Sequence, residues 1–314
     1  METYNKYAAY LKERYGGKVY KIPVHLPVTC PNRDGTCGIG GCSFCGEAGA
    51  GYEMRDAYEA VKVQLDANMQ YIGQKYKAQF FIAYFQNFSN TYMPLKLFKE
   101  VLEEIQHEDI IGIAISTRPD CIHTQYLDVL KEWSLKTKKE VCIELGLQTV
   151  NYHSLKKVNR GHSLAEYLDA FFKIKSYHFE ICTHLILNLP WDNMDDVIEN
   201  AKCMTALKSD YVKLHALYLV KGTPMAEDYL SGKINLITRE DYQQRVIHFL
   251  RYLSKDIIVQ RIIGRAPKSY TLFSNWDTSW WKIHDEIVEE MIQKEYSQGD
   301  LCDYIEGKAV RKFL

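Results

Sequence analysis

Short apolar runs alternate with longer amphipathic stretches along most of this chain. The short runs predict strands, and apolar positions three or four residues apart predict helices. The expected strands are Val19–Leu26, Gln79–Phe85, Ile110–Ser116, Glu140–Leu145, Glu180–Leu187 and Tyr211–Leu219. The expected helices between them are Asp56–Tyr76, Pro94–Gln106, His123–Trp133, Ser163–Tyr177 and Met194–Leu207. This α/β order predicts a parallel sheet covered by helices, as either a doubly wound sheet or a barrel.

The pattern changes after about Lys233. A helix is expected at Arg239–Leu253, a short strand at Ile257–Ile263 and a last helix at Ser279–Tyr296, with an irregular aromatic segment before that helix. We therefore expect residues 1–235 to form the main α/β domain and residues 236–314 to form an extension packed against it.

Charge and cysteine content limit the function classes. The 314 residues include 39 basic and 40 acidic side chains, whereas proteins that bind many phosphates usually show a basic excess, so a large nucleic-acid partner is disfavoured. No signal sequence or membrane-length apolar run is visible. Nine cysteines, an odd number, favour metal or thiol chemistry over disulfides. We therefore expect a cytoplasmic protein that does not associate with membranes.

Four of the cysteines lie close together, at Cys30, Cys37, Cys42 and Cys45. They follow the first expected strand, at the carboxyl end of the sheet, where α/β folds place their active sites. Thiolates select zinc or iron–sulfur clusters. A structural zinc site usually has two Cys-x-x-Cys pairs, and this segment has one. Spacing alone leaves both kinds of metal site open.

Polar residues recur on one face of several expected strands. Alternation places His184 and Asn188 opposite a leucine-rich face, and Lys213 and His215 opposite an apolar face, while Glu144 stands between apolar neighbours. We expect these side chains to line a ligand chamber; the alternative is that they reach solvent at the strand ends.

The segment Cys30-Pro-Asn-Arg-Asp-Gly-Thr, followed by Gly41-Cys42-Ser-Phe-Cys45, resembles the signature of radical S-adenosylmethionine (SAM) proteins related to the elongator-complex catalytic subunit. Agreement continues over about residues 15–225, in the segments Tyr84-Phe-Gln-Asn-Phe-Ser-Asn90, Ser116-Thr-Arg-Pro-Asp120, Glu144-Leu-Gly-Leu-Gln148 and Asn159-Arg160-Gly-His162. The resemblance implies a partial (β/α)6 TIM-type barrel with a C-terminal α/β extension. It also implies a [4Fe–4S] cluster on Cys30, Cys42 and Cys45, with SAM on the open iron. Cys37 departs from the family pattern.

Resemblance also suggests how SAM is held. As in oxygen-independent coproporphyrinogen oxidases, Arg160 is expected to pair with the SAM carboxylate and Gln148 to meet its polar end, although Arg160 could be a solvated loop residue. The usual Gly-Gly-Glu motif is replaced by a polar segment. The remaining SAM contacts that we expect are Gln86, Asn90, Thr91, Glu144 and Asn188. For Glu144 the alternatives are a substrate contact and a strand-end salt bridge.

Residues 260–282 are dense in cations and aromatic rings, a mixture that can stack a heterocycle and bind a phosphate. The alternative is packing of the last helix onto the barrel. The substrate contacts that we expect are His184, Lys213, His215, Arg261, Arg265 and Trp276.

The resemblance implies a 5′-deoxyadenosyl radical that abstracts hydrogen from a small, nucleotide-like substrate, with an electron donor such as flavodoxin or ferredoxin. The most specific expectation is a queuine lyase, which releases queuine from queuosine 5′-monophosphate. The alternatives are an elongator-like enzyme that modifies tRNA or another RNA and, from a different class, a binding protein with a zinc knuckle.

Overall fold

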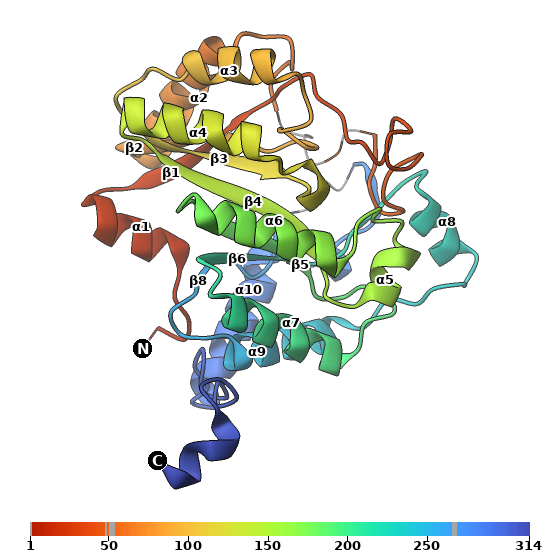
Figure 1. Cartoon of the computed structure of the whole chain (residues 1–314). Coiled ribbons are helices and arrows are strands. Elements are labelled where there is room, and N and C mark those ends of the chain that lie inside the picture. The colour runs from red at the N-terminus through yellow and green to blue at the C-terminus, as the bar shows by residue number, and fades with distance from the viewer. Residues whose placement is uncertain (1, 48, 50–53, 266–268) are drawn as a thin grey trace. The chain divides into compact units, whose positions relative to one another are not determined.

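The computed structural model describes residues 2–47, 49, 54–265 and 269–314 (Figure 1). The strands are β1 (Val19–Val24), β2 (Phe80–Phe85), β3 (Ile110–Thr117), β4 (Glu140–Gln148), β5 (Glu180–Ile186), β6 (Tyr211–His215), β7 (Leu219–Val220), β8 (Ile258–Arg261) and β9 (Thr271–Phe273). The α-helices are α1 (Tyr7–Tyr15), α2 (Val61–Tyr76), α3 (Leu95–Glu103), α4 (Thr124–Thr137), α5 (Tyr152–Lys157), α6 (Leu164–Ser176), α7 (Met194–Leu207), α8 (Pro224–Leu230), α9 (Arg239–Tyr252) and α10 (Trp280–Gln293). Short 3₁₀ helices are η1 (Pro119–Cys121), η2 (Asn275–Asp277) and η3 (Lys308–Phe313).

The predicted order of strands and helices is confirmed, with shifted ends. The helix expected from Asp56 begins at Val61, because the Asp56 carboxylate accepts the Tyr58 N–H at 3.0 Å and forms a turn instead. The strand expected to reach Leu219 ends at His215. Helices α1, α5 and α8 were not predicted; each is nine residues or shorter. In the described part of the chain, no helix has the length and apolar character needed to cross a membrane.

The chain forms two compact units. The N-terminal unit contains residues 8–147 and 155–182, and the C-terminal unit contains residues 1–7, 148–154 and 183–314. The predicted domain boundary at residue 235 remains a prediction.

The strand order of the main sheet is β1-β2-β3-β4-β5-β6-β8. The pairs β1–β2, β2–β3 and β3–β4 of the N-terminal unit are parallel, as is β6–β8 of the C-terminal unit. Strands β2 to β4 are buried almost continuously, which explains why they read as unbroken apolar runs. Helices α2, α3 and α4 lie on one side of β1 to β4 (Figure 1).

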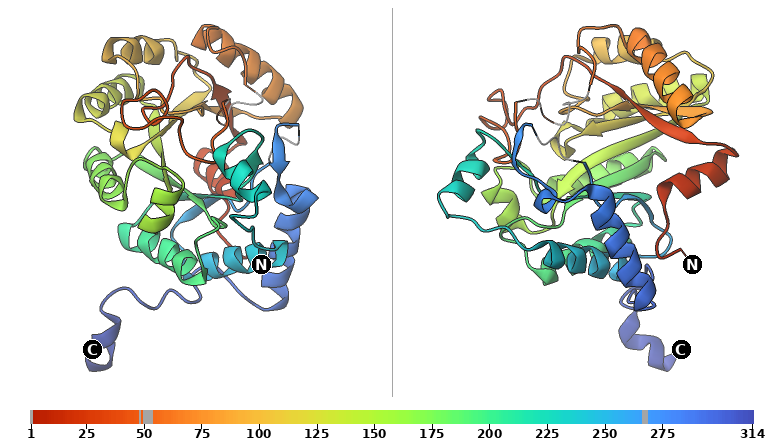
Figure 2. Two further views of the ribbon diagram at one scale, coloured as in Figure 1. Left: turned by 90° about the vertical axis from the view of Figure 1, so that its right-hand side faces the viewer. Right: turned by 180° about the vertical axis from the view of Figure 1, so that it is seen from behind.

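In the C-terminal unit, α9 packs against both α7 and α10 (Figure 2). Capping boxes begin two of these helices, Asn193 with Asp196 at α7 and Thr238 with Asp241 at α9. From α9, Arg245 donates to the carbonyl oxygens of Leu187 at 2.8 Å and Asp192 at 2.7 Å. These bonds join α9 to the segment that follows β5.

Candidate active site

The cysteine segment is a compact loop closed by its own backbone. Hydrogen bonds run from Cys37 N to Pro31 O, from Gly41 N to Asn32 O, both at 2.8 Å, and from Cys45 N to Cys42 O at 2.9 Å. Glycine is required beside Asn32, because a Cβ on Gly38 would lie 2.3 Å from the Asn32 side-chain oxygen. We refer to residues 30–45 as the cysteine loop.

The four cysteines of this loop differ in their surroundings. Cys42 is buried, Cys30 and Cys45 are partly buried, and Cys37 is exposed. Burial, and then the nearby Cys42, raise the pKa of Cys45 to about 11, and Cys30 contributes further. Cys45 therefore lies within electrostatic reach of both other predicted ligands. The predicted set of Cys30, Cys42 and Cys45 remains a prediction, as does the exclusion of Cys37.

Side-chain N–H groups point at two of the sulfur atoms. Arg160 Nη1 lies 3.4 Å and Asn32 Nδ2 lies 3.8 Å from Cys42 Sγ, and Arg33 Nη1 lies 3.6 Å from Cys45 Sγ. Donors stabilise a thiolate better than a thiol, and hydrogen bonds to sulfur are a standard means of tuning iron–sulfur clusters. This donor set fits a cluster bound through thiolates.

Residues 158–161, which lie between α5 and α6, support the cysteine loop. Ser43 N donates to Val158 O at 2.9 Å, and the side chain of Asn159 donates to Gly41 O at 2.8 Å. In return, Asn32 Nδ2 donates to Asn159 O at 2.6 Å. Gly161 adopts φ +77°, and a Cβ there would lie 2.5 Å from the Asn32 side-chain oxygen. The segment Asn159-Arg160-Gly-His162 therefore shapes the cysteine loop as well as presenting Arg160.

An ion pair after β3 fixes the same segment. Arg118 is 2% exposed, bonds Asp120 through two nitrogens, and donates through Nη1 to Arg160 O at 2.8 Å. Asp120 keeps the Arg118 charge compensated, and the pKa of Arg118 is raised above its usual range. The segment Ser116-Thr-Arg-Pro-Asp120 thus holds the backbone of Arg160 in place through this hydrogen bond.

Arg160 itself has no carboxylate partner among the described residues. It is 7% exposed, and its Nη2 donates to Gly146 O at 2.7 Å. Its Nε is buried and has no hydrogen-bond partner in the described structure. A buried guanidinium without a counter-ion is costly unless an anion binds to it. The residue therefore fits the predicted contact with a carboxylate better than it fits a solvated loop arginine.

Asn90, in the polar segment after β2, has a similar orphaned atom. Its amide nitrogen faces the carbonyl oxygens of Phe85, Asn87 and Ser116 at 2.9–3.0 Å, which fixes its orientation. Its side-chain oxygen is buried without a partner in the described structure. An acceptor in this position fits the predicted contact with the SAM amine.

Two further residues of this segment, Thr91 and Gln86, were expected to contact SAM. The Thr91 hydroxyl contacts the Thr117 hydroxyl at 2.6 Å and donates to Cys121 O at 2.8 Å, so it is engaged within the protein. Gln86 is partly buried.

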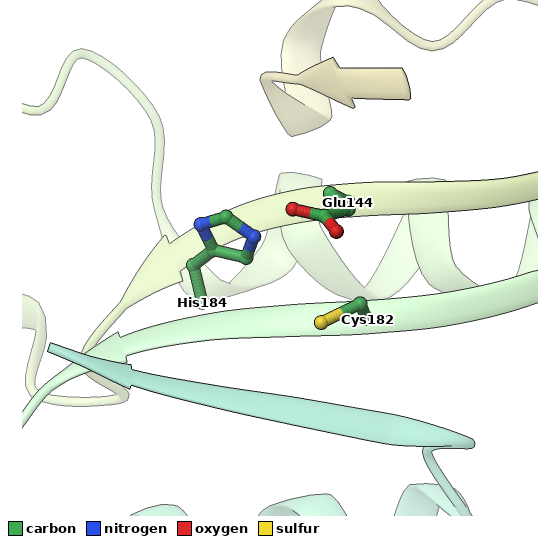
Figure 3. Close-up of side chains that lie close together, drawn as sticks. All are labelled: Glu144, Cys182 and His184. Carbon is green, nitrogen blue, oxygen red and sulfur yellow. The ribbon is translucent and has the colours of Figure 1, made fainter. Parts of the chain in front are cut away.

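Glu144 on β4 is 1% exposed and forms an ion pair with Lys21 of β1, whose ammonium lies 5.1 Å from the centre of the Tyr84 ring. Its carboxylate also lies within 4.8 Å of Cys182 Sγ on β5. Figure 3 shows these two side chains, with His184 two residues further along β5. The ion pair matches the salt-bridge alternative for Glu144, and a cofactor contact remains a prediction.

The other two predicted SAM contacts, Gln148 and Asn188, belong to the C-terminal unit. Gln148 ends β4 with φ +79°. Asn188 is fully buried and accepts the Leu217 N–H at 2.6 Å, while its Nδ2 has no partner among the described residues.

The C-terminal unit brings three predicted substrate contacts together. The rings of His184 and His215 lie 5.1 Å apart, and Arg261 Nη2 lies 2.7 Å from His215 Nδ1. Lys213 pairs with Arg261 in the register of β6 and β8 and is 7% exposed. Arg265 is exposed.

Trp276 is held within an aromatic cluster. Its ring lies 5.2 Å from Tyr242 and 5.6 Å from Phe273, and its indole N–H donates to Ile237 O at 2.8 Å. These contacts match the alternative of aromatic packing, and a role in binding substrate remains a prediction.

Sequence reasoning missed Asn32, Arg33 and Arg118 as functional residues. All three stand inside the segments that carry the resemblance, so their position beside the cysteines and Arg160 was the available signal.

Comparison with known proteins agrees with this geometry. The family model described as "Radical SAM superfamily" matches residues 30–204, and "Radical_SAM C-terminal domain" matches residues 209–293. The uncharacterized protein YtqA of Bacillus subtilis is 33% identical over 309 residues, which cover 98% of this chain and 95% of YtqA. Protein YhcC of Escherichia coli K12 is 32% identical over 278 residues, 88% of each chain.

Among solved structures, the archaeal Methanocaldococcus infernus Elp3 aligns with a TM-score of 0.66 at 15% identity, covering 89% of this chain and 64% of that chain. At this identity the likeness shows the fold alone. It confirms the partial barrel of the radical SAM type that the sequence predicted.

Proposed function

Because the chain belongs to the radical SAM superfamily, we propose that it binds one [4Fe–4S] cluster and SAM and begins radical chemistry on a nucleotide-like substrate. When bound, the reduced cluster and SAM supply a 5′-deoxyadenosyl radical that can abstract a hydrogen atom. The family implies these two cofactors. The substrate class and the lyase reaction are our proposal.

The observation that supports this proposal best is the set of N–H donors around the cysteine loop. Arg160, Asn32 and Arg33 direct nitrogen atoms at Cys42 and Cys45, although the chain offers no counter-ion to Arg160 among the described residues. A structural disulfide would not need such donors, whereas an anionic cluster bound through thiolates would be stabilised by them.

In this proposal, residues of the N-terminal unit bind the cluster and bind and orient SAM. Cys30, Cys42 and Cys45 would hold the cluster. Arg160 would hold the SAM carboxylate through Nε, and the Asn90 side-chain oxygen would accept from its amine. Arg118 would keep Arg160 in place through the 2.8 Å bond to its carbonyl.

The most specific candidate reaction is that of a queuine lyase, with queuosine 5′-monophosphate as substrate and queuine as product. This candidate depends on the sequence resemblance, and the cation and histidines beside β6 and β8 suit a phosphorylated nucleotide. The second candidate is an elongator-like enzyme that modifies RNA. It is favoured by the sequence resemblance to the elongator-complex catalytic subunit over about residues 15–225.

Anaerobic assays separate the two candidates. Purified protein is reconstituted with iron and sulfide, reduced with dithionite, and incubated with SAM and either queuosine 5′-monophosphate or unmodified tRNA. We expect deoxyadenosine together with free queuine from the nucleotide. Deoxyadenosine without queuine would overturn the lyase reaction, and turnover only with tRNA would establish the second candidate. A colourless protein without bound iron would overturn the radical SAM assignment itself.

We also propose a cytoplasmic location and a flavodoxin or ferredoxin as electron donor. The nine cysteines are all free thiols, which suits a reducing compartment, and a cluster of this type needs a one-electron donor. Reduction of the reconstituted cluster by flavodoxin or ferredoxin, followed by its visible absorbance, tests the donor.

A further inference from the structure

Arg261, at the end of β8, has no anionic partner among the described residues. Arg261 is partly buried, and its only hydrogen-bond partner among the described residues is His215. No carboxylate of the described chain forms an ion pair with it. Its Nε is buried and has no partner in the described structure. Arginines in such surroundings are normally paired with an anion or a set of carbonyl oxygens.

Arg245 in the same unit shows how a buried guanidinium is usually satisfied, by hydrogen bonds to carbonyl oxygens. It is 8% exposed, and both of its terminal nitrogens donate to backbone carbonyl oxygens, of Leu187 and of Asp192. These bonds tie α9 to a loop, so Arg245 has a structural role. The side chain of Arg261 makes no hydrogen bond to a carbonyl oxygen among the described residues. A purely structural role therefore leaves its guanidinium unexplained.

The surroundings of Arg261 hold the guanidinium in a fixed orientation. A guanidinium can only donate, so His215 Nδ1 is the acceptor of the 2.7 Å contact. Gly264 also lies close to the guanidinium, because a Cβ there would lie 2.8 Å from Arg261 Cζ and 3.0 Å from Nη2. Gly264 therefore leaves just enough room for the guanidinium plane. Such close packing reduces the entropy lost when a ligand binds.

The position is that of a binding site. Arg261 is the last residue of β8 and His215 is the last residue of β6, and these strands are parallel. Both side chains therefore start from the carboxyl ends of strands, where α/β folds bind their ligands. His184 is also near the carboxyl end of its strand, and its ring lies 5.1 Å from that of His215 at an interplanar angle of 34°.

We propose that Arg261, oriented by His215 and Gly264, binds a phosphate group of the substrate. The Nε–H and a neighbouring guanidinium N–H offer two parallel donors, which match two oxygens of a phosphate. This proposal deepens the proposed function, because it names the group by which a nucleotide would be recognised. The phosphate could belong to a free nucleotide or to an RNA backbone.

The first experiment measures phosphate binding without catalysis. Inorganic phosphate is titrated at constant ionic strength into the full-length protein, with and without reconstituted cluster, and the melting temperature is followed. We expect phosphate to raise the melting temperature of the wild type and to have little effect on Arg261→Gln. The control, Arg311→Gln, removes an exposed arginine and should respond as the wild type does. Equal responses of Arg261→Gln and the wild type would overturn the proposal.

A second variant covers the case in which Arg261→Gln does not fold. Gly264→Ala keeps the positive charge and adds a methyl group against the guanidinium. We expect roughly tenfold weaker phosphate binding or more, in line with the loss of a charge-assisted hydrogen bond. Unchanged phosphate affinity in a folded Gly264→Ala protein would contradict the geometry that we describe.

The source of the phosphate is tested with three further probes. Guanosine 5′-monophosphate, guanosine and a tRNA anticodon stem-loop are compared by calorimetry. Tighter binding of the monophosphate than of guanosine, lost in Arg261→Gln, identifies a nucleotide phosphate. Binding of the stem-loop alone, lost in the same variant, identifies an RNA phosphate. Because cluster-free protein is included, these results do not depend on whether the radical SAM reaction is detected.

Discussion

Within the described residues, each unit contains a partly or fully buried arginine without a carboxylate partner, and the two arginines are held differently. Arg160 in the N-terminal unit bonds a cysteine sulfur and a backbone carbonyl, and it is 7% exposed. Arg261 in the C-terminal unit bonds a histidine side chain and packs on a glycine. Arg118, with Asp120 beside it, shows the ordinary compensated arrangement.

Under the function that we propose, this difference separates a cofactor site from a substrate site. Arg160 contacts the Cys42 sulfur of the cysteine loop, and the backbone of that loop is closed by its own hydrogen bonds and depends on glycines at fixed positions. The contacts around Arg261 come from side chains at strand ends, which can change without altering the fold. A shared cofactor with a variable substrate requires that division.

The largest expected effect concerns the cysteine loop. Cys42 is buried and accepts two N–H groups, whereas Cys37 is exposed. We expect Cys42→Ser to lose the cluster and nearly all deoxyadenosine formation, and Cys37→Ser to keep both. Bound iron and visible absorbance of the anaerobic protein are the measurements. Loss of iron in Cys37→Ser would show that the three-cysteine prediction has chosen the wrong ligands.

The next effect concerns Arg160. Arg160 contacts Cys42 Sγ through Nη1 and Gly146 O through Nη2, and Nε remains for a SAM carboxylate. The one side-chain nitrogen of a lysine cannot occupy all three of these positions. We expect SAM to bind about ten to a hundred times more weakly in this variant, measured by equilibrium dialysis on reconstituted protein.

Two controls accompany that measurement. Arg55→Gln removes an exposed arginine that is paired with Glu59, and it should leave SAM affinity unchanged. Arg261→Gln should also leave SAM affinity unchanged while it weakens phosphate binding. If Arg261→Gln weakened SAM binding as strongly as Arg160→Lys does, the division into a cofactor arginine and a substrate arginine would be wrong.

Sequence reasoning reached the two sites unequally for a physical reason. The cysteines and Arg160 lie in short contiguous segments, so their residue types and order were enough to predict the fold class and the family. The bond from Arg118 to Arg160 O joins residues 42 positions apart and depends on where β3 ends. Nothing in the local pattern of either segment predicts it.

The Arg261 site was predicted only as a set of polar residues. His215 and Arg261 are 46 positions apart and meet because β6 and β8 are adjacent and parallel. The sequence predicted β8 as part of an extension packed on the barrel and not as a strand of the main sheet, so it could not place Arg261 beside β6. Trp276 was predicted from composition, and its contacts with Tyr242 and Phe273 could not be read from spacing.

A moderate, pH-dependent effect is expected at His162, next to the Arg160 segment. Burial, followed by the charges of Arg160 and Arg118, lowers the pKa of His162 to about 2. The folded protein therefore stays unprotonated there while an unfolded histidine takes up a proton near pH 6.5. The stability contributed by the neutral ring is present above about pH 6.5 and is lost as the pH falls.

His162→Gln tests this linkage. We expect the free energy of unfolding of the wild type to exceed that of the variant at pH 7.5, and the gap to narrow by about 1.4 kcal/mol at pH 5.5. Urea denaturation at the two pH values is the measurement. A gap that stays constant between them would mean that the ring titrates in the folded protein as it does in the unfolded chain.

The smallest expected effect concerns the helix caps of the two units. It tests whether the units differ in helix capping as they differ at Arg160 and Arg261. Helix α6 of the N-terminal unit begins with a capping box of Ser163 and Glu166, and α9 of the C-terminal unit with one of Thr238 and Asp241. The Ser163 hydroxyl accepts the Ala165 N–H at 3.2 Å, and the Thr238 hydroxyl accepts the Asp241 N–H at 3.0 Å. A cap depends on the first turn of its own helix, so Ser163→Ala and Thr238→Ala should each cost about 1 kcal/mol of unfolding free energy. Urea denaturation of the two variants should therefore give equal losses, unaffected by phosphate or SAM. A loss several times larger in one of them would mean that its cap also supports a binding site, and the contrast between the units would then extend beyond Arg160 and Arg261.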